Sequence, residues 1–352
     1  MTAFARELPL AAKVQVIAHR GASALRPEHT LAAYVKAIED GADFIEPDLV
    51  VTRDGVLVAR HENEISGTTD VAAHPEFAAR RTNKQTDGVT VSGWFAEDFT
   101  LVELKTLRAR ERLPELRSTA YDGQFEIPTL DEIIKCVALA SKACGRIVGI
   151  IPEIKHSTYF MQQGLPLEDR LLDVLAAHAY TQSAPIEIQS FEITNLRYLR
   201  GKLETQSSRT GHSNIRLLQL LDAADQQPYD VADSGGKLTY GQMCQPAGLK
   251  QVATYADAIG PERRAIVPLN ADGDFAAPTA LVRDAHAVGL EVHPYTFRPE
   301  NIFLPLSLRC GADPQSVNAA GCIADIRACL DAGIDAFFTD APALGRRALE
   351  RR

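Results

Sequence analysis

Two acidic residues stand where an apolar run of the sequence ends. Glu46 and Asp48 lie two positions apart within Phe44–Val51, with Pro47 between them. Alternate side chains of an extended chain point to the same side, so the two carboxylates should share one face. Pro47 has no N–H to give to a neighbouring strand, so we expect regular strand pairing to stop or bulge at this position.

The chain then doubles back and delivers a histidine. The pair Asp54-Gly55 is a strong signal for a two-residue hairpin turn. If these two residues form the loop, Asp48 lies opposite His61, with their Cβ atoms ~5 Å apart. A one-residue bulge would change this register. The pattern therefore predicts an imidazole close to the acids.

Polar or aromatic residues also follow other apolar runs, and in a barrel of parallel strands catalytic residues gather at the carboxyl ends of the strands. Three carboxylates supply only oxygen ligands, which favours a hard ion, Ca²⁺ or Mg²⁺, over zinc. Two histidines are then available as general acid and base, and two cations suit phosphate oxygens. This chemistry points to phosphoryl transfer or phosphodiester cleavage. The set comprises His19, Arg20, Glu46, Asp48, His61, Glu153 and Lys155, with Gln189, Phe191 and Tyr295 as weaker candidates for lining a pocket.

Each of these residues also has an ordinary structural explanation. Arg20 with Glu46, and Lys155 with Glu153, could be ion pairs at the rim of a barrel. A single histidine or aromatic residue at a strand end is more often structural than catalytic. Seven such residues at the ends of three strands and one hairpin nevertheless favour a functional site. For three further residues we expect structural roles, at the start of a helix, at a helix N-cap and in the core: His29, Asp340 and His293.

Eight apolar, β-rich runs alternate with helical patterns along the chain. They read as continuous apolar segments, as expected for parallel strands buried on both faces. Helix signals lie between them: Thr30 begins a helix that ends at Gly41, and Thr129 with Glu132 forms a capping box. Eight repeats favour an α/β fold of the (β/α)₈ TIM barrel type, and no GxGxxG turn supports an open doubly wound sheet. The expected strands are Val14–Ala18, Phe44–Val51, Ile147–Ile154, Ile186–Gln189, Ile215–Leu220, Ala265–Leu269, Leu290–His293 and Ala336–Phe338.

One segment does not fit the repeat. Residues 63–128 are polar and irregular, and they are too long for a simple loop between a strand and a helix. Thr100 and Glu103 within the segment form a second capping box. We expect residues 1–352 to form a single barrel domain, with 63–128 as a small cap inserted after the second strand.

Composition limits the classes of partner. The 352 residues carry a formal net charge of −9, so there is no basic surplus to neutralise nucleic acid. No run approaches the ~20 apolar residues of a membrane span. The N-terminus lacks a convincing signal peptide, which indicates either an intracellular protein or a removed leader. The six cysteines show no zinc spacing and are expected mostly as small buried hydrophobes, although a Cys310 disulfide to Cys322 or Cys329 remains open.

Several motifs together resemble the glycerophosphodiester phosphodiesterase family. The resemblance covers roughly residues 14–345 and is greatest to the bacterial periplasmic type. The motifs are HRGAS, PEHT, E-x-D and the histidine after the Asp-Gly turn, followed by PEIK at 152–155, QSF at 189–191, HPYTFR at 293–298 and GIDAFFTDAP at 333–342.

The resemblance implies a (β/α)₈ barrel that hydrolyses glycerophosphodiesters such as glycerophosphocholine to glycerol 3-phosphate and an alcohol. It also implies a Ca²⁺ ion, with Mg²⁺ as the alternative, and proteins that are commonly dimeric and exported to the periplasm. The rivals are a phospholipase-type enzyme of the same superfamily that acts on intact lipids, and a non-catalytic binding protein on the same barrel. The implied roles are metal binding for Glu46, Asp48 and Glu153, acid/base catalysis for His19 and His61, and phosphate binding for Arg20 and Lys155. For Glu28 the implied role is to orient either the glycerol end of the substrate or the residues that support the site from behind.

Overall fold

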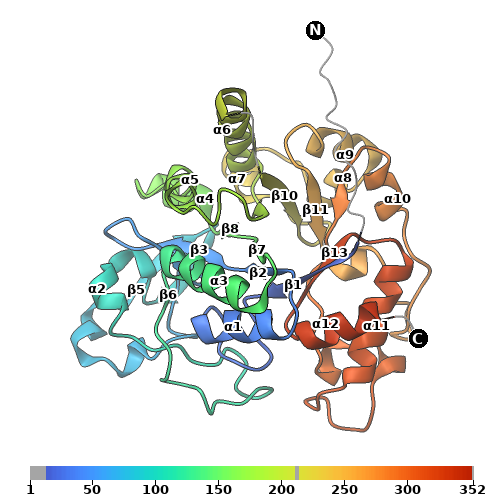
Figure 1. Ribbon diagram of the computed structural model, residues 1–352, viewed down its shortest axis with the longest axis horizontal. Helices are drawn as coiled ribbons and strands as arrows, with labels where there is room; N and C mark the ends of the chain where they lie inside the picture. The colour runs from blue at the N-terminus through green and yellow to red at the C-terminus, as the bar shows by residue number, and fades with distance from the viewer. Residues whose placement is uncertain (1–12, 211–213, 351–352) are drawn as a thin grey trace. The chain divides into compact units, whose positions relative to one another are not determined.

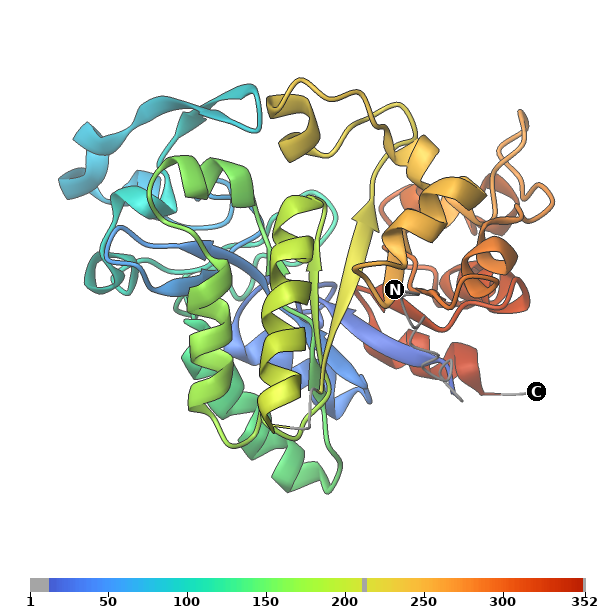
Figure 2. The same cartoon turned by 90° about the horizontal axis from the view of Figure 1, so that it is seen from above.

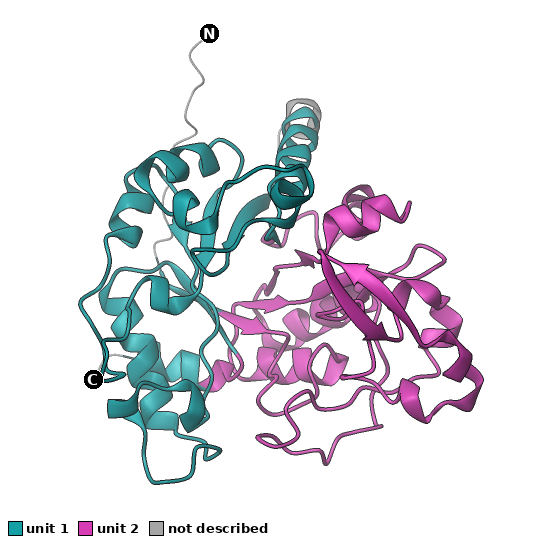
Figure 3. Ribbon diagram, turned by 180° about the vertical axis from the view of Figure 1, so that it is seen from behind, with its two compact units in different colours: residues 1–16, 189–339, 344–352 teal, residues 17–188, 340–343 magenta. Residues whose placement is uncertain are grey.

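The computed structural model describes residues 13–210 and 214–350 (Figure 1). The chain divides into two compact units, coloured separately in Figure 3. One comprises residues 17–188 with 340–343, and the other comprises 1–16, 189–339 and 344–352. The residues expected to bind metal and transfer protons all belong to the first of these, which we call the catalytic unit.

The catalytic unit contains parallel strands whose pairing follows the apolar runs. Strand β1 (Gln15–His19) pairs with β2 (Phe44–Glu46), β2 with β7 (Gly149–Ile150), and β7 with the start of β9 (Ile186–Ser190). All of these pairings are parallel, and the paired residues are largely buried. The mixed α/β class expected from the sequence is confirmed, whereas closure into a barrel stays a prediction.

Two of the expected strands are interrupted at proline. The run Phe44–Val51 divides at Pro47 into β2 and β3 (Asp48–Val51), and Ile147–Ile154 divides before Pro152 into β7 and β8 (Glu153–Ile154). Strand β3 pairs in parallel with β8 and antiparallel with β4 (Leu57–Ala59). The break expected at Pro47 is therefore present, because proline cannot donate to a ladder.

Among the helices of the catalytic unit, two begin at the caps that the sequence predicts. Thr30 accepts a hydrogen bond from the Ala33 N–H at the start of α1, and Gly41 follows the helix with φ +90°. The capping box of Thr129 and Glu132 opens α3, and the views in Figures 1 and 2 show α1 and α3 side by side. These helices are α1 (Leu31–Glu39), α3 (Leu130–Cys144), α4 (Ser157–Gln162) and α5 (Glu168–Ala177).

The segment 63–128 has short elements of its own. Its strands β5 (Thr82–Thr86) and β6 (Val89–Gly93) form a separate antiparallel hairpin, and Figure 2 shows this hairpin (cyan) at the end of the unit away from α3. The capping box of Thr100 and Glu103 is present and opens a one-turn helix. The role of the segment as a cap stays a prediction. Its helical elements are η1 (Val71–Ala73), η2 (Pro75–Arg80), η3 (Ala96–Asp98) and α2 (Leu101–Leu104).

The other unit carries the remaining parallel strands. Strand β10 (Ile215–Leu221) pairs with β11 (Ala258–Pro261), and β11 pairs with β12 (Glu291–Val292). The chain after β12 lies beside β13 (Ala336–Thr339) through a parallel bridge from Phe297 to Thr339. These are parallel neighbours, as the apolar runs predict.

One expected strand is wrong. The apolar stretch Ala265–Leu269 is not a strand, and residues 263–265 form a 3₁₀ turn, η4 (Arg263–Ala265). The strand is β11 instead, whose Gly260 and Pro261 resemble turn residues in the sequence. A Cβ at Gly260 would lie 2.7 Å from Leu220 Cδ2, so the glycine permits close packing on β10. Tertiary packing overrides the local pattern here.

Helices of this second unit are mostly short. Cys322 and Cys329 lie buried in α11, as expected for small hydrophobes, while Cys310 is exposed. Within the described ranges, 13–210 and 214–350, no helix has the length and apolar character needed to cross a bilayer. The helices are α6 (Thr194–Thr210), α7 (Tyr229–Asp233), α8 (Tyr240–Met243), α9 (Pro246–Val252), α10 (Leu281–His286), η5 (Asn301–Phe303), η6 (Leu306–Leu308), α11 (Ala319–Asp331) and α12 (Pro342–Leu349), the last of which begins in the catalytic unit.

Candidate active site

Strand register brings three carboxylates together in the catalytic unit. Asp48 lies directly opposite Glu153 in the β3–β8 pair, and His19 lies opposite Glu46 in the β1–β2 pair. One carboxylate oxygen from each of Glu46, Asp48 and Glu153 lies within 4.8 Å of the other two, and all three residues are buried. Such a group of oxygen ligands has the chemistry of a hard-cation site.

The hairpin delivers His61 with a register that differs from the expected one. Leu49 pairs with Ala59, and the Arg60 N–H donates to the Asp48 carbonyl at 2.9 Å, so Arg60 and not His61 faces Asp48 in the ladder. The register prediction is wrong by one residue because the loop has three residues, with Gly55 in the left-handed region at φ +84°.

The Thr52 side chain closes this three-residue loop by accepting from the Val56 N–H at 3.0 Å. His61 nevertheless lies near enough to Asp48 for the two groups to interact electrostatically. The chain thus brings the imidazole near the acids through a turn that differs from the expected one, and the role of His61 stays a prediction.

Burial and mutual repulsion perturb the three acids strongly. Burial and the neighbouring Asp48 raise the pKa of Glu46 well above its usual range, and burial raises the pKa of Glu153 to about 8. Burial would also raise the pKa of Asp48, but the nearby Lys155 cation and the hydrogen bond with His29 outweigh it and lower that pKa well below its usual range. The Oδ1 atom of Asp48 is buried without a hydrogen-bond partner among the described residues. A cation would satisfy that oxygen and relieve the repulsion, so the residues present fit a divalent ion.

Arg20 and Lys155 contact the acids directly. Arg20 has φ +59°; its backbone N–H donates to Glu46 at 2.8 Å, and its guanidinium contacts Glu28 at 2.9 Å and Asp48 at 3.2 Å. Lys155 Nζ lies 2.8 Å from Glu153 Oε1. Burial would lower both cations' pKa values, but the adjacent carboxylates raise them, so both side chains stay charged. The structural alternative expected ion pairs of Lys155 with Glu153 and of Arg20 with Glu46. The first pair is present, whereas the Arg20 guanidinium pairs with Glu28 and Asp48 instead.

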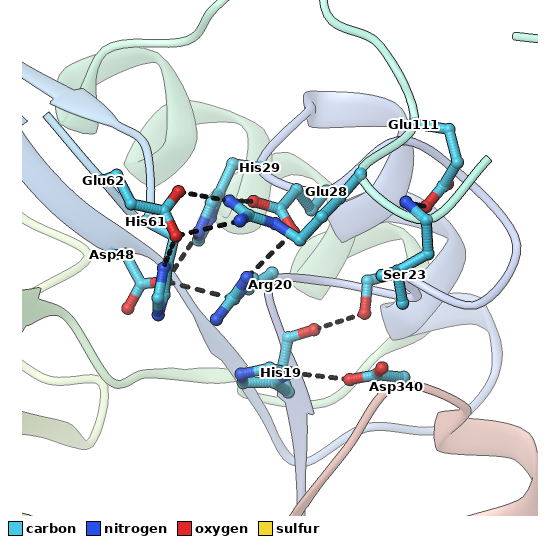
Figure 4. Close-up of polar contacts among 12 residues, drawn as sticks. His19, Arg20, Ser23, Glu28, His29, Asp48, His61, Glu62, Glu111 and Asp340 are labelled. Atoms are coloured by element: carbon cyan, nitrogen blue, oxygen red, sulfur yellow. Dashed lines mark hydrogen bonds and ion pairs between the residues drawn. The ribbon is translucent and has the colours of Figure 1, made fainter. Parts of the chain in front are cut away.

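Each of the two histidines lies against a carboxylate (Figure 4). His19 Nδ1 lies 2.6 Å from Asp340 Oδ1, and His61 Nδ1 lies 2.5 Å from Glu62 Oε1. Because an ionised carboxylate only accepts, each Nδ1 carries the proton and Nε2 is left for a reacting group. Burial, Arg20 and Lys155 lower the pKa of His61 to about 3, so its ring is neutral.

The chain matches the model of the "Glycerophosphoryl diester phosphodiesterase family" over residues 19–344. The chain belongs to this family. The expectation of an enzyme of this family is thereby confirmed. A glycerophosphodiester phosphodiesterase of Arabidopsis thaliana is 39% identical over 303 residues, covering 82% of this chain and 76% of the plant protein. The Haemophilus influenzae glycerophosphodiester phosphodiesterase is 29% identical over 300 residues, covering 81% of this chain and 79% of its own.

Solved structures of phosphodiesterases share the fold. An Oleispira antarctica phosphodiesterase, in complex with the product sn-glycerol-3-phosphate, matches with a TM-score of 0.60 at 20% identity, covering 96% of this chain and 97% of that chain. A glycerophosphodiester phosphodiesterase from Agrobacterium tumefaciens matches with a TM-score of 0.53 at 18% identity, covering 94% and 98%. The α/β fold is therefore that of the phosphodiesterase family.

Three substrate-binding candidates of this family member lie in the second unit. Phe191 and Tyr295 meet edge to face with ring centroids 6.0 Å apart, and the Tyr295 hydroxyl donates to the Leu221 carbonyl at 2.9 Å. Gln189 is buried at the end of β9. The structure therefore brings Phe191 and Tyr295 together, and contact of all three residues with substrate stays a prediction. His293 is buried and bonded to Glu291, which fits its expected core role.

Sequence reasoning missed the residues that contact the candidate catalytic groups. Asp340 was expected only as a helix N-cap and His29 only at the start of a helix, yet they contact His19 and Asp48 respectively. Glu62 directly follows His61, and that His-Glu pair was a detectable signal. Arg112 contacts Glu62, and Arg117 contacts Asp340. No periodic pattern marks these two arginines, which come from an irregular part of 63–128.

Proposed function

We propose that this protein hydrolyses glycerophosphodiesters to glycerol 3-phosphate and an alcohol in a metal-dependent reaction. The observation that carries the proposal is the buried group of Glu46, Asp48 and Glu153, whose oxygens lie within 4.8 Å of one another. Family membership and the catalytic-unit histidines support it. The proposal includes the (β/α)₈ barrel with 63–128 inserted.

Glu46, Asp48 and Glu153 would hold the divalent ion. Their all-oxygen character favours Ca²⁺, with Mg²⁺ as the alternative. When bound, such an ion supplies Lewis-acid polarisation of a phosphate oxygen and neutralises charge that develops on phosphorus. His29 would keep Asp48 in place, since its Nε2 lies 2.9 Å from Asp48 Oδ2.

The phosphodiester would lie against Arg20 and Lys155. Both cations are buried and charged, so they can neutralise phosphate oxygens without a cost of charging them on binding. Glu28 accepts from Arg20 at 2.9 Å and orients its guanidinium. Through this contact with Arg20, Glu28 would support the glycerol end of the site.

Proton transfer would divide between the two histidines. The neutral ring of His61 has the form required of a base, and its Nε2 takes the proton of the attacking oxygen. The attacking oxygen belongs to water or to the glycerol 2-hydroxyl. In the second case the first product is a cyclic phosphate, which water then opens to glycerol 3-phosphate. The attacking oxygen forms a bond to phosphorus while the bond to the leaving alkoxide breaks. His19 gives a proton to that alkoxide from Nε2, while Asp340 holds its Nδ1 at 2.6 Å and so keeps Nε2 aimed at the leaving oxygen.

Product identification tests the proposal. Glycerophosphocholine is incubated with the protein and Ca²⁺, and glycerol 3-phosphate is measured with a coupled dehydrogenase. We expect glycerol 3-phosphate from the wild type and none from His19→Ala, whose thermal unfolding should stay close to that of the wild type. Phosphatidylcholine vesicles serve as the comparison, and hydrolysis of the vesicles alone would support a phospholipase instead. Absence of product from glycerophosphocholine with either Ca²⁺ or Mg²⁺ would contradict the proposal.

A further inference from the structure

The loop 111–117 of the inserted segment carries an arginine that holds His61 through a carboxylate. Arg112 Nη1 donates to Glu62 Oε1 at 2.9 Å, and Nη2 donates to Glu62 Oε2 at 2.6 Å. The same Glu62 oxygen, Oε1, accepts from His61 Nδ1 at 2.5 Å. A planar guanidinium that engages both oxygens fixes the plane of the carboxylate as well as its place.

The same loop carries a second arginine that holds His19 in the same way. Arg117 Nη2 donates to Asp340 Oδ2 at 2.6 Å, and Asp340 Oδ1 accepts from His19 Nδ1 at 2.6 Å. Arg117 Nη1 also donates to the Ser23 carbonyl at 3.1 Å, while the Ser23 hydroxyl donates to the His19 carbonyl at 2.8 Å. The side chains of Arg117 and Asp340 are only 6% and 2% exposed, so water competes little for this chain of contacts.

Arg112 reaches a third member of the site. Its Nε and Nη2 donate to the two oxygens of Glu28 at 2.7 and 2.6 Å, and Glu28 in turn accepts from Arg20 at 2.9 Å. One arginine therefore connects the carboxylates beside His61 and beside Arg20. Burial opposes the charge on Glu62, but His61 and Arg112 lower its pKa below the usual range, so Glu62 remains an ionised acceptor.

The loop is tied to itself and can serve as a support. The Leu113 N–H donates to Glu111 Oε1 at 2.9 Å, and the Arg117 N–H donates to the Leu113 carbonyl at 2.9 Å. The Glu111 N–H donates to Asp122 Oδ1 at 2.7 Å, which joins the loop to the rest of the segment. The two arginines are thus presented from a hydrogen-bonded turn.

We propose that Arg112 and Arg117 are positioning residues, which fix the orientation and tautomer of His61 and His19 through Glu62 and Asp340. The inserted segment then belongs to the catalytic apparatus, because both proton-transfer groups depend on one of its loops. An imidazole whose Nδ1–H is held by a clamped carboxylate keeps Nε2 aimed at the reacting atoms. This inference rests on the proposed function.

Steady-state kinetics with glycerophosphocholine test the inference. We expect Arg112→Ala and Arg117→Ala to lower kcat by roughly 10–100-fold, the usual effect of losing a partner that orients a functional ligand, with KM changed less than about 2-fold. Arg110→Ala is the matched control, since Arg110 adjoins the same loop, its side chain is 54% exposed, and that side chain forms an ion pair with Asp122 at 3.6 Å and not with Glu62 or Asp340. The control should keep the wild-type kcat. If either alanine variant fails to fold, Arg112→Lys or Arg117→Lys replaces it. Each should show the same loss, because a single ammonium cannot reproduce the two-pronged contact of Arg112 with Glu62 or the paired contacts of Arg117 with Asp340 and the Ser23 carbonyl.

A double-mutant cycle separates positioning from a general structural effect. If Arg117 acts through Asp340, adding Arg117→Ala to Asp340→Asn should cost less than about 2-fold further in kcat. Adding Arg112→Ala to Glu62→Gln should likewise lower kcat much less than Arg112→Ala does in the wild type. The loss of kcat that remains would be transmitted through the contacts of Arg112 with Glu28. Losses that multiply in the Asp340 pair would overturn the inference.

A readout without turnover keeps this test separate from the proposed function. In ¹⁵N NMR of the imidazole rings at a pH where both are neutral, assigned with His19→Gln and His61→Gln, the wild type should show each ring protonated at Nδ1. Arg117→Ala should shift His19, and Arg112→Ala should shift His61, toward a mixture of tautomers. Unchanged tautomers together with unchanged kcat would overturn the inference. Inactivity of the wild type on glycerophosphocholine would instead count against the proposed function, and the tautomer result would still decide whether the arginines position the rings.

Discussion

His29 Nε2 lies 2.9 Å from Asp48 Oδ2, and the Nδ1 atom of the same ring lies 2.9 Å from the Tyr34 hydroxyl. His29 is fully buried, and burial lowers its pKa, so the ring is neutral. A neutral ring that donates to Asp48 from Nε2 must accept from Tyr34 at Nδ1. The ring therefore orients one carboxylate of the candidate metal site.

Removal of this support should weaken ion binding. For His29→Ala we expect the Ca²⁺ affinity to fall by roughly 10–100-fold, because a carboxylate ligand without its orienting partner is less well placed. Isothermal titration calorimetry measures the affinity. His74→Ala is the control, because the His74 side chain contacts Asp70, Glu76 and Phe77, which belong to the inserted segment and not to the candidate metal site. Equal Ca²⁺ affinity in the wild type and His29→Ala would contradict the role of His29.

Ion removal should destabilise the fold. Without a cation, three buried carboxylates repel one another, whereas an ion that binds only the folded state adds about 2.7 kcal/mol at a concentration 100 times its Kd. We expect the unfolding temperature to rise with Ca²⁺ and to fall with EDTA, as measured by calorimetry. The shift should vanish in Asp48→Asn. A wild-type unfolding temperature that is the same in Ca²⁺ and in EDTA would argue against an ion at this site.

Gly21 should tolerate no side chain. It follows Arg20 with φ +87°, and a Cβ at this position would lie 2.7 Å from the backbone carbon of Ala33 in α1. Gly21→Ala should destabilise the fold by more than the ~1 kcal/mol typical of a strained left-handed residue, and should lower activity by displacing Arg20. Gly123→Ala is matched to it, with φ +77° but open space around the new Cβ, and should cost only about 1 kcal/mol. Denaturant unfolding of both variants measures the difference, and equal losses would remove the steric argument.

The pH dependence of stability should carry a contribution from Glu111. Burial raises the pKa of Glu111 to about 7, above its ordinary value of 4.5. The folded state thus keeps the proton to higher pH than the unfolded state. This contribution to stability is complete below about pH 4.5 and is lost as pH rises through about 7.

Glu111→Gln should therefore reduce the loss of stability between pH 5 and pH 8, because glutamine keeps the acceptor for the Leu113 N–H without a titrating proton. Denaturant unfolding at both pH values measures this. Glu115→Gln, at an exposed position of the same loop, is the control and should lose stability as the wild type does. If Glu111→Gln loses as much unfolding free energy between pH 5 and pH 8 as the wild type does, another group is responsible for the pH dependence.

Local patterns were sufficient to predict the chain segment that carries Glu46 and Asp48, but not the register of the hairpin beside it. Alternation placed Glu46 and Asp48 on one side, and the missing N–H of Pro47 predicted the break between β2 and β3. The hairpin register was missed because it depends on whether Gly55 closes a two- or three-residue loop, and that choice is made by Thr52 and the backbone of Gly55 together.

The supports of the histidines could not be predicted from local patterns. Asp340 reaches His19 from 321 positions away in the sequence, and Arg117 reaches Asp340 from 223 positions away. Such contacts depend on tertiary placement of irregular loops, where neither periodicity nor turn chemistry fixes which side chains meet. The carboxylates of the candidate metal site follow apolar strands, and the strand pattern predicted their positions for that reason.

Metal-dependent turnover of glycerophosphocholine tests the central claim most directly. Glycerol 3-phosphate release is measured for the untreated protein, after EDTA, and after addition of excess Ca²⁺ or Mg²⁺, with Asp48→Asn alongside. The account predicts that EDTA abolishes release, that one of the two ions restores it in the wild type, and that neither restores it in Asp48→Asn. Release that continues unchanged in EDTA, or an Asp48→Asn variant as active as the wild type, would contradict the account.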